Sequence, residues 1–377
     1  MKLIITGANG FIARNIISKL DKKYEIILLT NKKLKFQYLK KYKNLRFDLS
    51  KNIIPKLSCD ILLHAAAITP QEKHTKEKYN KINNVGLKNI INRIKIKKKI
   101  IFFSTSDVYK NQNGNISFKE NFLIDTKKLD NYAKSKHNGE IYLKQLNKKK
   151  YSFKKIILRL PGIVGKGCHQ NFISDIVKKI IKNEKIVFFG KNNNFNNIYH
   201  IDVLSKLINI LINAKFNKNY EILNIGARKP LKIFQVIKCL KVKKENLELS
   251  KEKKHNFTLN VDKLNKYYKN NKTTKFNDQL NLDYHVKFLE QMCEQIRELS
   301  EEVTQRNGEL KRLEEVVEDM NSNMDEAICY QVGIGKKGIL ERNRELERDN
   351  QRYEEMMGWK MDKMRDLSEE DFKSGNY

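Results

Sequence analysis

The chain carries a tyrosine and a lysine four residues apart, Tyr132 and Lys136, at the start of a segment with helical character. This spacing places the phenol and the ammonium on one face of a helix. A positive charge beside a phenol lowers the pKa of the phenol and makes it a usable acid or base. The same spacing recurs in this lysine-rich chain at Tyr151 with Lys155 and at Tyr268 with Lys272. The pattern therefore needs a second feature before it selects a site.

A cluster of hydroxyl side chains supplies that second feature. Ser104-Thr105-Ser106-Asp107-Val108-Tyr109 follows directly after the apolar run 100–103, which is typical of a buried strand. In parallel sheets, ligands bind outside the carboxyl ends of the strands. We therefore expect the hydroxyl cluster and the Tyr132/Lys136 pair to meet at one edge of a sheet.

A glycine-rich turn follows the first apolar run of the chain. The segment is Thr6-Gly7-Ala8-Asn9-Gly10-Phe11-Ile12-Ala13, between a β-rich run at 2–6 and a helical pattern at 11–20. Gly7 permits a tight turn, Gly10 lets the backbone approach a pyrophosphate, and the small Ala13 lets the helix lie close to the sheet. The free N–H groups and the dipole of the helix start favour phosphate binding. This arrangement predicts a dinucleotide site.

The end of the second expected strand bears on which dinucleotide is bound. A carboxylate that binds the adenosine ribose is expected there, but Leu29 is followed by Thr30-Asn31-Lys32-Lys33. A lysine pair favours a 2′-phosphate, so NADP(H) is at least as good a candidate as NAD(H). The alternative is that Lys32 and Lys33 are two of many surface lysines.

Strand-like and helix-like segments alternate along the first 160 residues. This alternation predicts a parallel sheet built from βαβ units, hence an α/β fold. We expect strands at 2–6, 25–30, 60–66, 100–104 and 155–160, and helices at 11–20, 82–94 and 136–146. Residues 160–275 read as mixed α/β, with helices at 175–182 and 203–212 and short strands at 186–189 and 222–225.

After about residue 280 the pattern changes to a heptad repeat. Ten of eleven a and d positions are apolar, Arg306 being the exception, in a segment with many flanking glutamates. A repeat of period 3.5 held for five heptads predicts a coiled coil, rather than one helix packed on a domain. A turn at 329–338 and a second helix at about 339–366 are expected to follow. The a and d positions are Leu289, Met292, Ile296, Leu299, Val303, Arg306, Leu310, Leu313, Val317, Met320 and Met324.

The charge of the chain is divided at the same place. The 377 residues carry a net charge of +32, of which residues 1–280 contribute +41 and residues 281–377 contribute −9. A basic half is compatible with binding to nucleic acid or to a membrane surface. The lysines, however, are scattered through every segment instead of forming one stripe with interleaved aromatic residues. We therefore expect solvated faces and no specific nucleic-acid partner.

Cysteine usage and hydropathy set further limits. The five cysteines form no CxxC pair and no Cys/His cluster, so we expect neither a disulfide framework nor a metal site. A reducing, cytoplasmic setting fits this composition. The first apolar run is too short for a signal peptide, and no window of about 18 residues is apolar enough to span a membrane.

Taken in order, these motifs resemble the extended short-chain dehydrogenase/reductases, the NAD(P)-dependent epimerase/dehydratase family that acts on nucleotide sugars. The resemblance covers residues 1 to about 275 and implies a Rossmann-type sheet followed by an unrelated helical, coiled-coil-like tail. Its motifs are Gly7/Gly10/Ala13, Asp48-Leu49, His64-Ala65-Ala66-Ala67, Asn83/Gly86/Asn89, Thr105/Tyr109, Tyr132/Lys136, Leu158-Arg159-Leu160-Pro161, Tyr199-His200-Ile201-Asp202-Val203 and Asn224-Ile225-Gly226.

The resemblance implies a role for individual residues. Tyr132 would be the general acid/base, Lys136 would hold the nicotinamide ribose and tune Tyr132, and Thr105 would hydrogen-bond the reacting sugar oxygen. Tyr132 and Lys136 would also contact the cofactor. The other residues implied at the cofactor are Gly7, Asn9, Gly10, Phe11, Ile12, Asn31, Lys32, Asp48, Leu49, Ala65, Ala66, Ala67, Asn83 and Pro161. The residues implied at the substrate are Ser106, Asp107, Gly162 and Asn171.

The implied reaction is hydride transfer between a sugar carbon and the nicotinamide, through a keto-sugar intermediate, by an epimerase or dehydratase. Asp107 stands where family members with dehydratase or decarboxylase chemistry have a glutamate, and its side chain is one methylene shorter. Gly162 stands where a substrate-contacting Asn is common, and no arginine lies between Arg159 and Arg228 to clamp a diphosphate. The alternatives are an NADP(H)-dependent sugar reductase of the same family and a non-catalytic NADP(H)-binding scaffold oligomerised by its tail.

These observations predict three parts. Residues 1–160 would form the NAD(P)-binding part, residues 161–280 a smaller substrate-binding part with interleaved segments, and residues 281–377 the helical tail. We also expect a homo-oligomer, a dimer in the simplest case, which the tail would help to assemble.

Overall fold

The computed structural model describes most of the first 269 residues and short stretches of the tail. The described ranges are 1–51, 54–112, 117–165, 168, 175–176, 179, 184–190, 193–228, 230–235, 244–250, 257–269, 305, 308–309, 311–315, 344 and 348–349. The described tail residues are helical, but most of the expected heptads lie outside the described residues. The coiled coil and the self-association of the tail therefore stay predictions.

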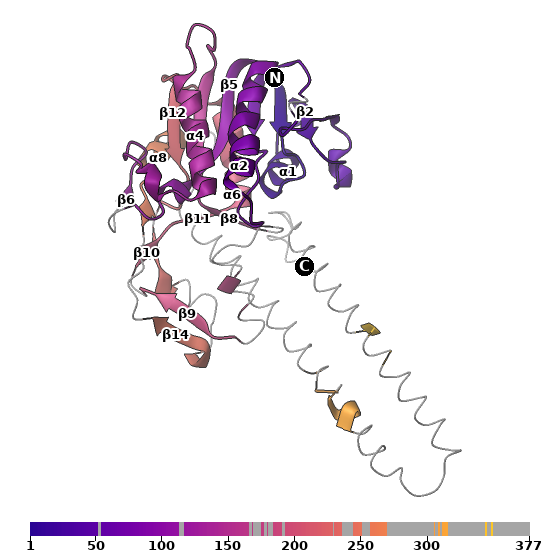
Figure 1. Ribbon diagram of the computed structural model, residues 1–377, viewed down its shortest axis with the longest axis vertical. Helices are drawn as coiled ribbons and strands as arrows, with labels where there is room; N and C mark the ends of the chain where they lie inside the picture. The colour runs from indigo at the N-terminus through magenta and orange to yellow at the C-terminus, as the bar shows by residue number, and fades with distance from the viewer. Residues whose placement is uncertain are drawn as a thin grey trace, which may run out of the picture.

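A seven-stranded parallel sheet forms the centre of the α/β part (Figure 1). Its order is β12-β7-β5-β4-β1-β2-β3, so the chain starts at β1, builds one half of the sheet, and returns to build the other half. The strands are β1 (Lys2–Thr6), β2 (Glu25–Thr30), β3 (Lys43–Arg46), β4 (Leu57–His64), β5 (Ile94–Thr105), β7 (Lys154–Leu160) and β12 (Tyr220–Asn224). The predicted parallel α/β fold is confirmed.

Helices cover both faces of this sheet. One face packs on α1 (Phe11–Ser18) and α6 (Ile201–Asn213). The other face packs on α3 (Gly86–Arg93) and α4 (Asn131–Gln145). Each central strand is buried on both sides because its side chains alternate between the two helical layers.

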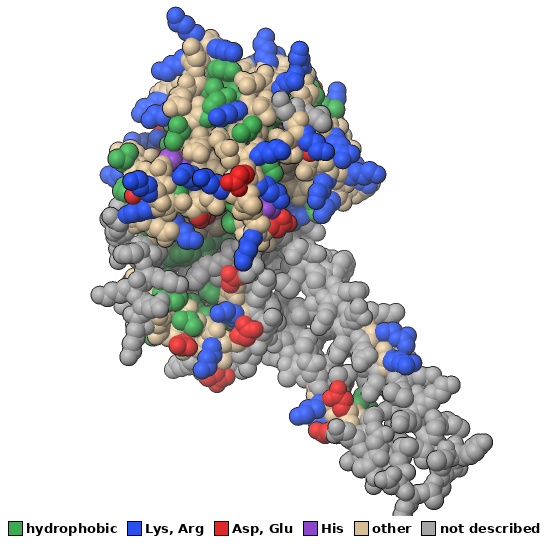
Figure 2. Space-filling model, viewed as in Figure 1, with side chains coloured by type: hydrophobic (Ala, Val, Ile, Leu, Met, Phe, Trp, Pro, Cys, Tyr) green, Lys and Arg blue, Asp and Glu red, His purple; other side chains and the backbone are tan. Residues whose placement is uncertain are grey.

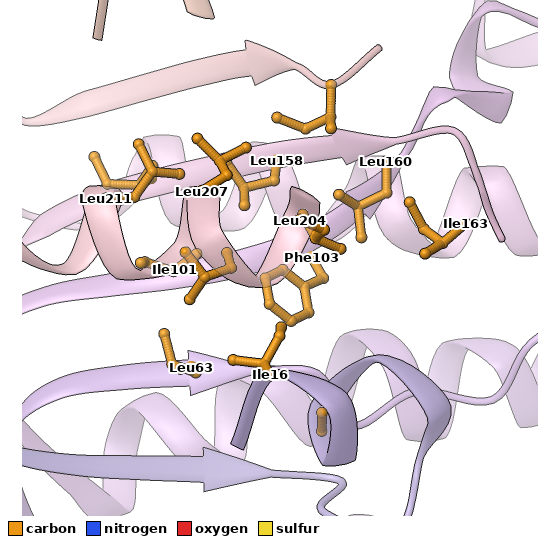
Figure 3. Packing of buried hydrophobic residues seen from close by; sticks show 14 of the residues in the cluster. Ile16, Leu63, Ile101, Phe103, Leu158, Leu160, Ile163, Leu204, Leu207 and Leu211 are labelled. Atoms are coloured by element: carbon orange, nitrogen blue, oxygen red, sulfur yellow. The ribbon is translucent and has the colours of Figure 1, made fainter. Parts of the chain in front are cut away.

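The α1/α6 layer shows how the helices contact the strands (Figure 3). Leu204, Leu207 and Leu211 recur at helical spacing along α6, and all are fully buried. They lie beside Leu158 and Phe103 of the neighbouring strands in the same apolar cluster. This burial fixes the sheet whose strand ends carry the candidate site.

Shorter elements surround the sheet. Small strands pair as β6 (Ser117–Phe118) with β15 (Thr258–Leu259), β8 (Gly162–Val164) with β11 (Ile198–His200), β9 (Ile186–Phe189) with β14 (Leu247–Ser250), and β10 (Asn194–Phe195) with β13 (Leu231–Lys232). The remaining helices are α2 (Lys76–Tyr79), α8 (Asp262–Lys269), the π-helix η2 (Asn80–Val85), and the 3-10 turns η1 (Gln37–Leu39), η3 (Ser106–Tyr109), η4 (Thr126–Lys128) and η5 (Lys244–Asn246).

Several element boundaries differ from those expected. Strand β5 begins at Ile94, six residues earlier than expected, because 94–98 continues the strand with alternating exposure. Helix α4 begins at Asn131, since Asp130 caps it by accepting a hydrogen bond from the Ala133 N–H (2.8 Å). The seventh strand, β12, and helix α6 come from beyond residue 160 and complete the sheet, so the chain interleaves. The expected helix 175–182 falls largely outside the described residues.

Basic side chains are scattered over the visible surface of the α/β part (Figure 2). Figure 2 shows lysine and arginine side chains distributed over the visible face of the α/β part, without one continuous stripe. Within the described ranges, no helix is long and apolar enough to cross a membrane. Those same residues include no group of three or more His, Cys, Asp or Glu that could hold a metal ion.

Candidate active site

The carboxyl ends of the central strands bring the expected residues to one edge of the sheet. Thr6 at the end of β1 lies opposite His64 at the end of β4, and Thr105 ends β5 opposite Leu160 of β7. Strand order reverses between β1 and β4, and the crevice at such a reversal is where parallel α/β sheets bind ligands. The edge that holds the hydroxyl cluster is therefore the edge that holds the glycine turn.

The glycine turn after β1 has the geometry that phosphate binding requires. Gly7 adopts a φ of 73°, and a Cβ there would lie 2.8 Å from the Ala66 Cα, so only glycine fits. The Gly10 N–H donates to the Gly7 carbonyl (2.8 Å) and closes the turn. Helix α1 then begins at Phe11 with no side-chain cap and no acidic residue in its first turn. The dipole of this helix start favours an anion, which no acidic side chain opposes.

A buried hydrogen-bond chain joins the ends of β1 and β4. The Thr6 hydroxyl accepts from the Ala66 N–H (3.0 Å) and is hydrogen-bonded to His64 Nδ1 (3.0 Å). His64 is 1% exposed and its ring stacks on Phe102 of β5. Burial lowers the pKa of His64 to about 3, and the nearby Lys136 adds to this, so the imidazole is neutral. The Ala65–Ala67 segment is thereby held against the glycine turn.

One of the expected cofactor residues, Asn9, ties the segment after β2 to the glycine turn. The Asn9 amide donates to the Lys33 carbonyl (2.9 Å) and its oxygen accepts from the Lys35 N–H (3.0 Å). The side chain of Asn9 thus holds the segment after β2, which contains Asn31 and Lys32, beside the turn. Both Asn31 and Lys32 are exposed.

Asp48 and Leu49 follow β3 in a tight turn. The Asp48 carboxylate accepts from the Ser50 N–H (2.8 Å) and hydroxyl (2.6 Å), and the hydroxyl bond is the main cause that lowers the pKa of Asp48. Leu49 is buried, and Gly86 of α3 approaches it so closely that a Cβ on Gly86 would lie 2.9 Å from the Leu49 Cβ. Gly86 therefore sets the distance between α3 and this turn.

Asn83 supports the loop after β4. Its amide accepts from the Ile68 N–H (2.9 Å) and donates to the Ile68 carbonyl (3.1 Å) and the Ser135 hydroxyl (3.0 Å). Asn83 is 2% exposed, so these bonds take the place of the hydrogen bonds that its amide would make with water. Its polar groups thus connect the Ala65–Ala67 loop with α4, the helix that carries Tyr132 and Lys136.

Thr105 and Tyr132 meet above the end of β5. The Thr105 oxygen accepts from the Asp107 N–H (3.1 Å), which helps to orient the hydroxyl. Burial raises the pKa of Tyr132, and the Asp107 and Asp130 carboxylates raise it further. The Thr105 hydroxyl hydrogen-bonds the phenol and acts in the opposite direction. A threonine hydroxyl and a phenol within hydrogen-bond reach form a pair that can hold a substrate oxygen and move its proton.

Lys136 lies on the same helix, deeper in the protein. It is 3% exposed, and its ammonium stands 4.9 Å from the Phe102 ring centroid. Burial lowers the pKa of Lys136 to about 7, whereas the Glu140 carboxylate raises it. An ammonium with a pKa near neutral pH gains or loses its proton easily. The expected effect of Lys136 on the pKa of Tyr132 stays a prediction.

The residues expected at the substrate lie around this pair, with one exception. Ser106 and Asp107 belong to η3, directly after Thr105, and burial raises the pKa of the Asp107 carboxyl. Pro161 and Gly162 follow β7, where the Gly162 N–H donates to the Asn197 carbonyl (3.1 Å). Asn171 lies outside the described residues.

The structure separates the Tyr-x-x-x-Lys pairs. Tyr151 precedes β7 at the opposite edge of the sheet, where the Lys155 ammonium donates to the Tyr151 carbonyl (2.6 Å) and the Tyr151 hydroxyl to Asn92 Oδ1 (3.1 Å). Neither of these two hydrogen bonds involves a hydroxyl cluster. The Tyr268/Lys272 pair extends beyond the described residues.

The sequence analysis did not predict one contact between buried residues, which centres on Glu140. Glu140 on α4 and Arg159 on β7 form an ion pair (2.7 Å) directly beneath the site, with Ser104 bound to the same carboxylate. Single charged residues 19 positions apart give no periodic signal. The one signal in the sequence that could have suggested this ion pair is the position of Glu140, one helical turn after Lys136.

The described residues fit a nicotinamide dinucleotide. The cradle at Gly7, the uncapped start of α1 and the unpartnered buried Nε2 of His64 all lie at the same edge as Tyr132 and Lys136. The glycine turn would hold the pyrophosphate, and Lys136 and Tyr132 would face the nicotinamide ribose.

Comparison with known proteins gives a consistent result. A model of the NAD dependent epimerase/dehydratase family matches residues 3–226, more than half of the chain. A GDP-6-deoxy-D-talose 4-dehydrogenase of Aggregatibacter actinomycetemcomitans is 24% identical over 251 residues, covering 64% of this chain and 79% of that protein.

Solved structures share the fold. A UDP-glucuronic acid 4-epimerase from Bacillus cereus in complex with NAD superposes with a TM-score of 0.60 at 21% identity, covering 80% of this chain and all of that one. A dTDP-glucose 4,6-dehydratase from Bacillus anthracis, also in complex with NAD, gives 0.58 at 17% identity, covering 77% and 97%.

Proposed function

The chain belongs to the NAD dependent epimerase/dehydratase family, and on that premise we propose that it is an NAD(P)-dependent enzyme that acts on a nucleotide sugar. The reaction is hydride transfer through a keto-sugar intermediate. The observation that carries the proposal is the meeting of Thr105 and Tyr132 at the strand edge that also holds the Gly7 turn. Relatives in complex with NAD and with UDP-glucuronic acid support it.

Each of the three residues has a separate task. Tyr132 takes the proton from the sugar hydroxyl as that carbon is oxidised, and returns it when the carbonyl is reduced. Thr105 holds the same sugar oxygen, because its own oxygen is already oriented by the Asp107 N–H. Lys136 holds the cofactor ribose, and its positive charge favours the phenolate form of Tyr132. The bound dinucleotide supplies the hydride acceptor and donor.

The outcome after the first hydride transfer has two candidates. An epimerase or dehydratase returns the hydride to the same sugar, as in the B. cereus and B. anthracis relatives by their names. A dehydrogenase or reductase stops after one transfer, as the name of the A. actinomycetemcomitans relative implies for that protein. Asp107 follows Thr105 in η3 and its buried carboxyl has a raised pKa, which supports a dehydratase within the first candidate.

A panel of UDP-, GDP- and dTDP-sugars tests the proposal. Each sugar is incubated with the full-length protein and NAD⁺, NADP⁺, NADH or NADPH, and read for absorbance at the reduced-nicotinamide band and, after chromatographic separation of epimers, for product mass. An epimerase gives a product of unchanged mass and no net absorbance change, a dehydratase a loss of water, and a reductase a stoichiometric absorbance change. Absence of any product across the panel would refute the proposal.

A further inference from the structure

Glu140 is a buried carboxylate with no part in the proposed chemistry. It is 1% exposed and lies one helical turn after Lys136 on α4, so the two side chains share a face of the helix. A carboxylate in this position must be paired and hydrogen-bonded to offset the loss of solvent. Its partners therefore show what the residue holds together.

The partners of Glu140 come from the two central strands beneath the site. The Ser104 hydroxyl of β5 donates to Oε1 (2.5 Å). Arg159 of β7 donates through Nε to Oε1 (3.1 Å) and through Nη2 to Oε2 (2.7 Å), a bidentate arrangement. His137, one turn earlier on α4, lies 3.3 Å from Oε2. One carboxylate thus fastens α4 to the ends of β5 and β7.

Arg159 extends the connection to the hydroxyl cluster. Its Nη1 donates to the Tyr109 hydroxyl (2.6 Å), and its guanidinium lies 5.0 Å from the Tyr109 ring centroid. The Tyr109 hydroxyl in turn donates to Asn224 Oδ1 at the end of β12 (2.9 Å). Tyr109 is the last residue of η3, the turn that contains Asp107.

The three segments that carry the proposed site therefore converge on Glu140. Ser104 precedes Thr105, Tyr109 ends the turn after Thr105, and Glu140 lies on the helix of Tyr132 and Lys136. From this geometry we propose that Glu140 is a positioning residue, which sets where Lys136 and Tyr132 stand relative to Thr105 and keeps Lys136 protonated when the cofactor binds. This inference rests on the proposed function, because it assigns Lys136 to the cofactor.

The electrostatic surroundings of Lys136 agree with this role. From α4 it faces Glu140, from β4 the neutral His64, and from β5 the apolar ring of Phe102. Burial lowers the pKa of Lys136 to about 7, and among these groups Glu140 is the one that raises it. Without that carboxylate, Lys136 would be deprotonated at a lower pH.

The test measures binding of NADH to the full-length protein as a function of pH, by nicotinamide fluorescence. In the wild type, affinity should fall as Lys136 loses its proton. In Glu140→Gln the midpoint of that fall should move to lower pH by about one to two units, as expected for a charge about 6 Å away at an effective dielectric of about 20. Glu140→Asp keeps the charge, so the pH midpoint of its NADH binding should lie close to that of the wild type.

A matched variant separates positioning from stability. Lys155→Met removes a charged side chain of a residue that is 2% exposed. Lys155 lies on the same strand as Arg159, but at the opposite edge of the sheet. The substitution should lower the urea midpoint and leave the pH dependence of NADH binding unchanged. An unchanged midpoint of NADH binding in folded Glu140→Gln, or the same shift in Lys155→Met, would overturn the inference. Because NADH binding needs no sugar, a failure of every sugar to react would count against the proposed function alone.

Discussion

Two buried histidines should make the protein sensitive to mild acid. His64 is 1% exposed and His200 is 3% exposed, and burial lowers the pKa of each to about 3. Between the ordinary pKa of 6.5 and this value, the unfolded chain binds protons that the native protein does not. The contribution of the two histidines to the free energy of unfolding is therefore complete above pH 6.5 and is lost as the pH falls toward 3.

The size of the effect follows from the same shifts. Lowering the pH from about 7 to about 5 should cost about 2 kcal/mol for each histidine, hence about 4 kcal/mol for the pair. Such a loss is a large part of the stability of an ordinary domain, which is about 5–15 kcal/mol. The free energy of unfolding at each pH is measured by urea titration followed by circular dichroism.

A substitution at the start of α6 isolates one of the two histidines. The His200 side chain accepts from the Asp202 N–H (3.2 Å) and so caps α6. Asn is a preferred capping residue that does not titrate, so His200→Asn should keep the cap and remove about half of the acid sensitivity. An unfolding free energy that stays constant between the two pH values in the wild type would refute the reasoning. So would an unaltered acid sensitivity in His200→Asn.

Three further substitutions test how the site is built. Gly7→Ala should lower NADH affinity at least about tenfold, because the left-handed backbone costs about 1–2 kcal/mol and the Cβ would meet the Ala66 backbone at 2.8 Å. Gly308→Ala, where a Cβ has no neighbour within 4 Å, is the control, and equal NADH binding in both variants would contradict this account. Gly139→Ala places a Cβ 2.9 Å from Phe102 Cζ and should cost about 1–3 kcal/mol in urea unfolding by overpacking α4 on β5; no loss would show that the contact relaxes freely. Thr105→Val should lower kcat about 100-fold with NADH affinity unchanged, and a full kcat would remove Thr105 from the site.

The sequence predicted those parts of the fold whose signals are local. The Gly7 turn was identified because a short apolar run, two glycines and a helical pattern follow one another within 20 residues. The true start of α4 was missed, since 131–135 is polar and its signal is the Asp130 cap instead of an apolar stripe. The true start of β5 was missed for a related reason, because lysines alternate with Ile94 and Ile96 at the exposed end of the strand.

The site was predicted less completely than the fold. Thr105 and Tyr132 were paired by assuming that strand ends share an edge, and the structure brings them together. The spacing of Tyr132 and Lys136 could not be distinguished from that of Tyr151 and Lys155, because the difference lies in which edge of the sheet each occupies. Glu140 and Arg159 could not be paired at all, since only the packing of α4 on β7 brings them within 2.7 Å.

The central claim is that Tyr132 performs the proton transfer, and its most direct test compares two phenylalanine variants. Tyr132→Phe removes only the phenolic oxygen, whereas Tyr151→Phe removes the same atom from the pair at the opposite edge of the sheet. With whichever nucleotide sugar reacts in the panel, Tyr132→Phe should lower kcat by about 10²–10⁴-fold while NADH affinity stays near that of the wild type. Tyr151→Phe should retain wild-type turnover. Wild-type turnover in Tyr132→Phe would contradict the account.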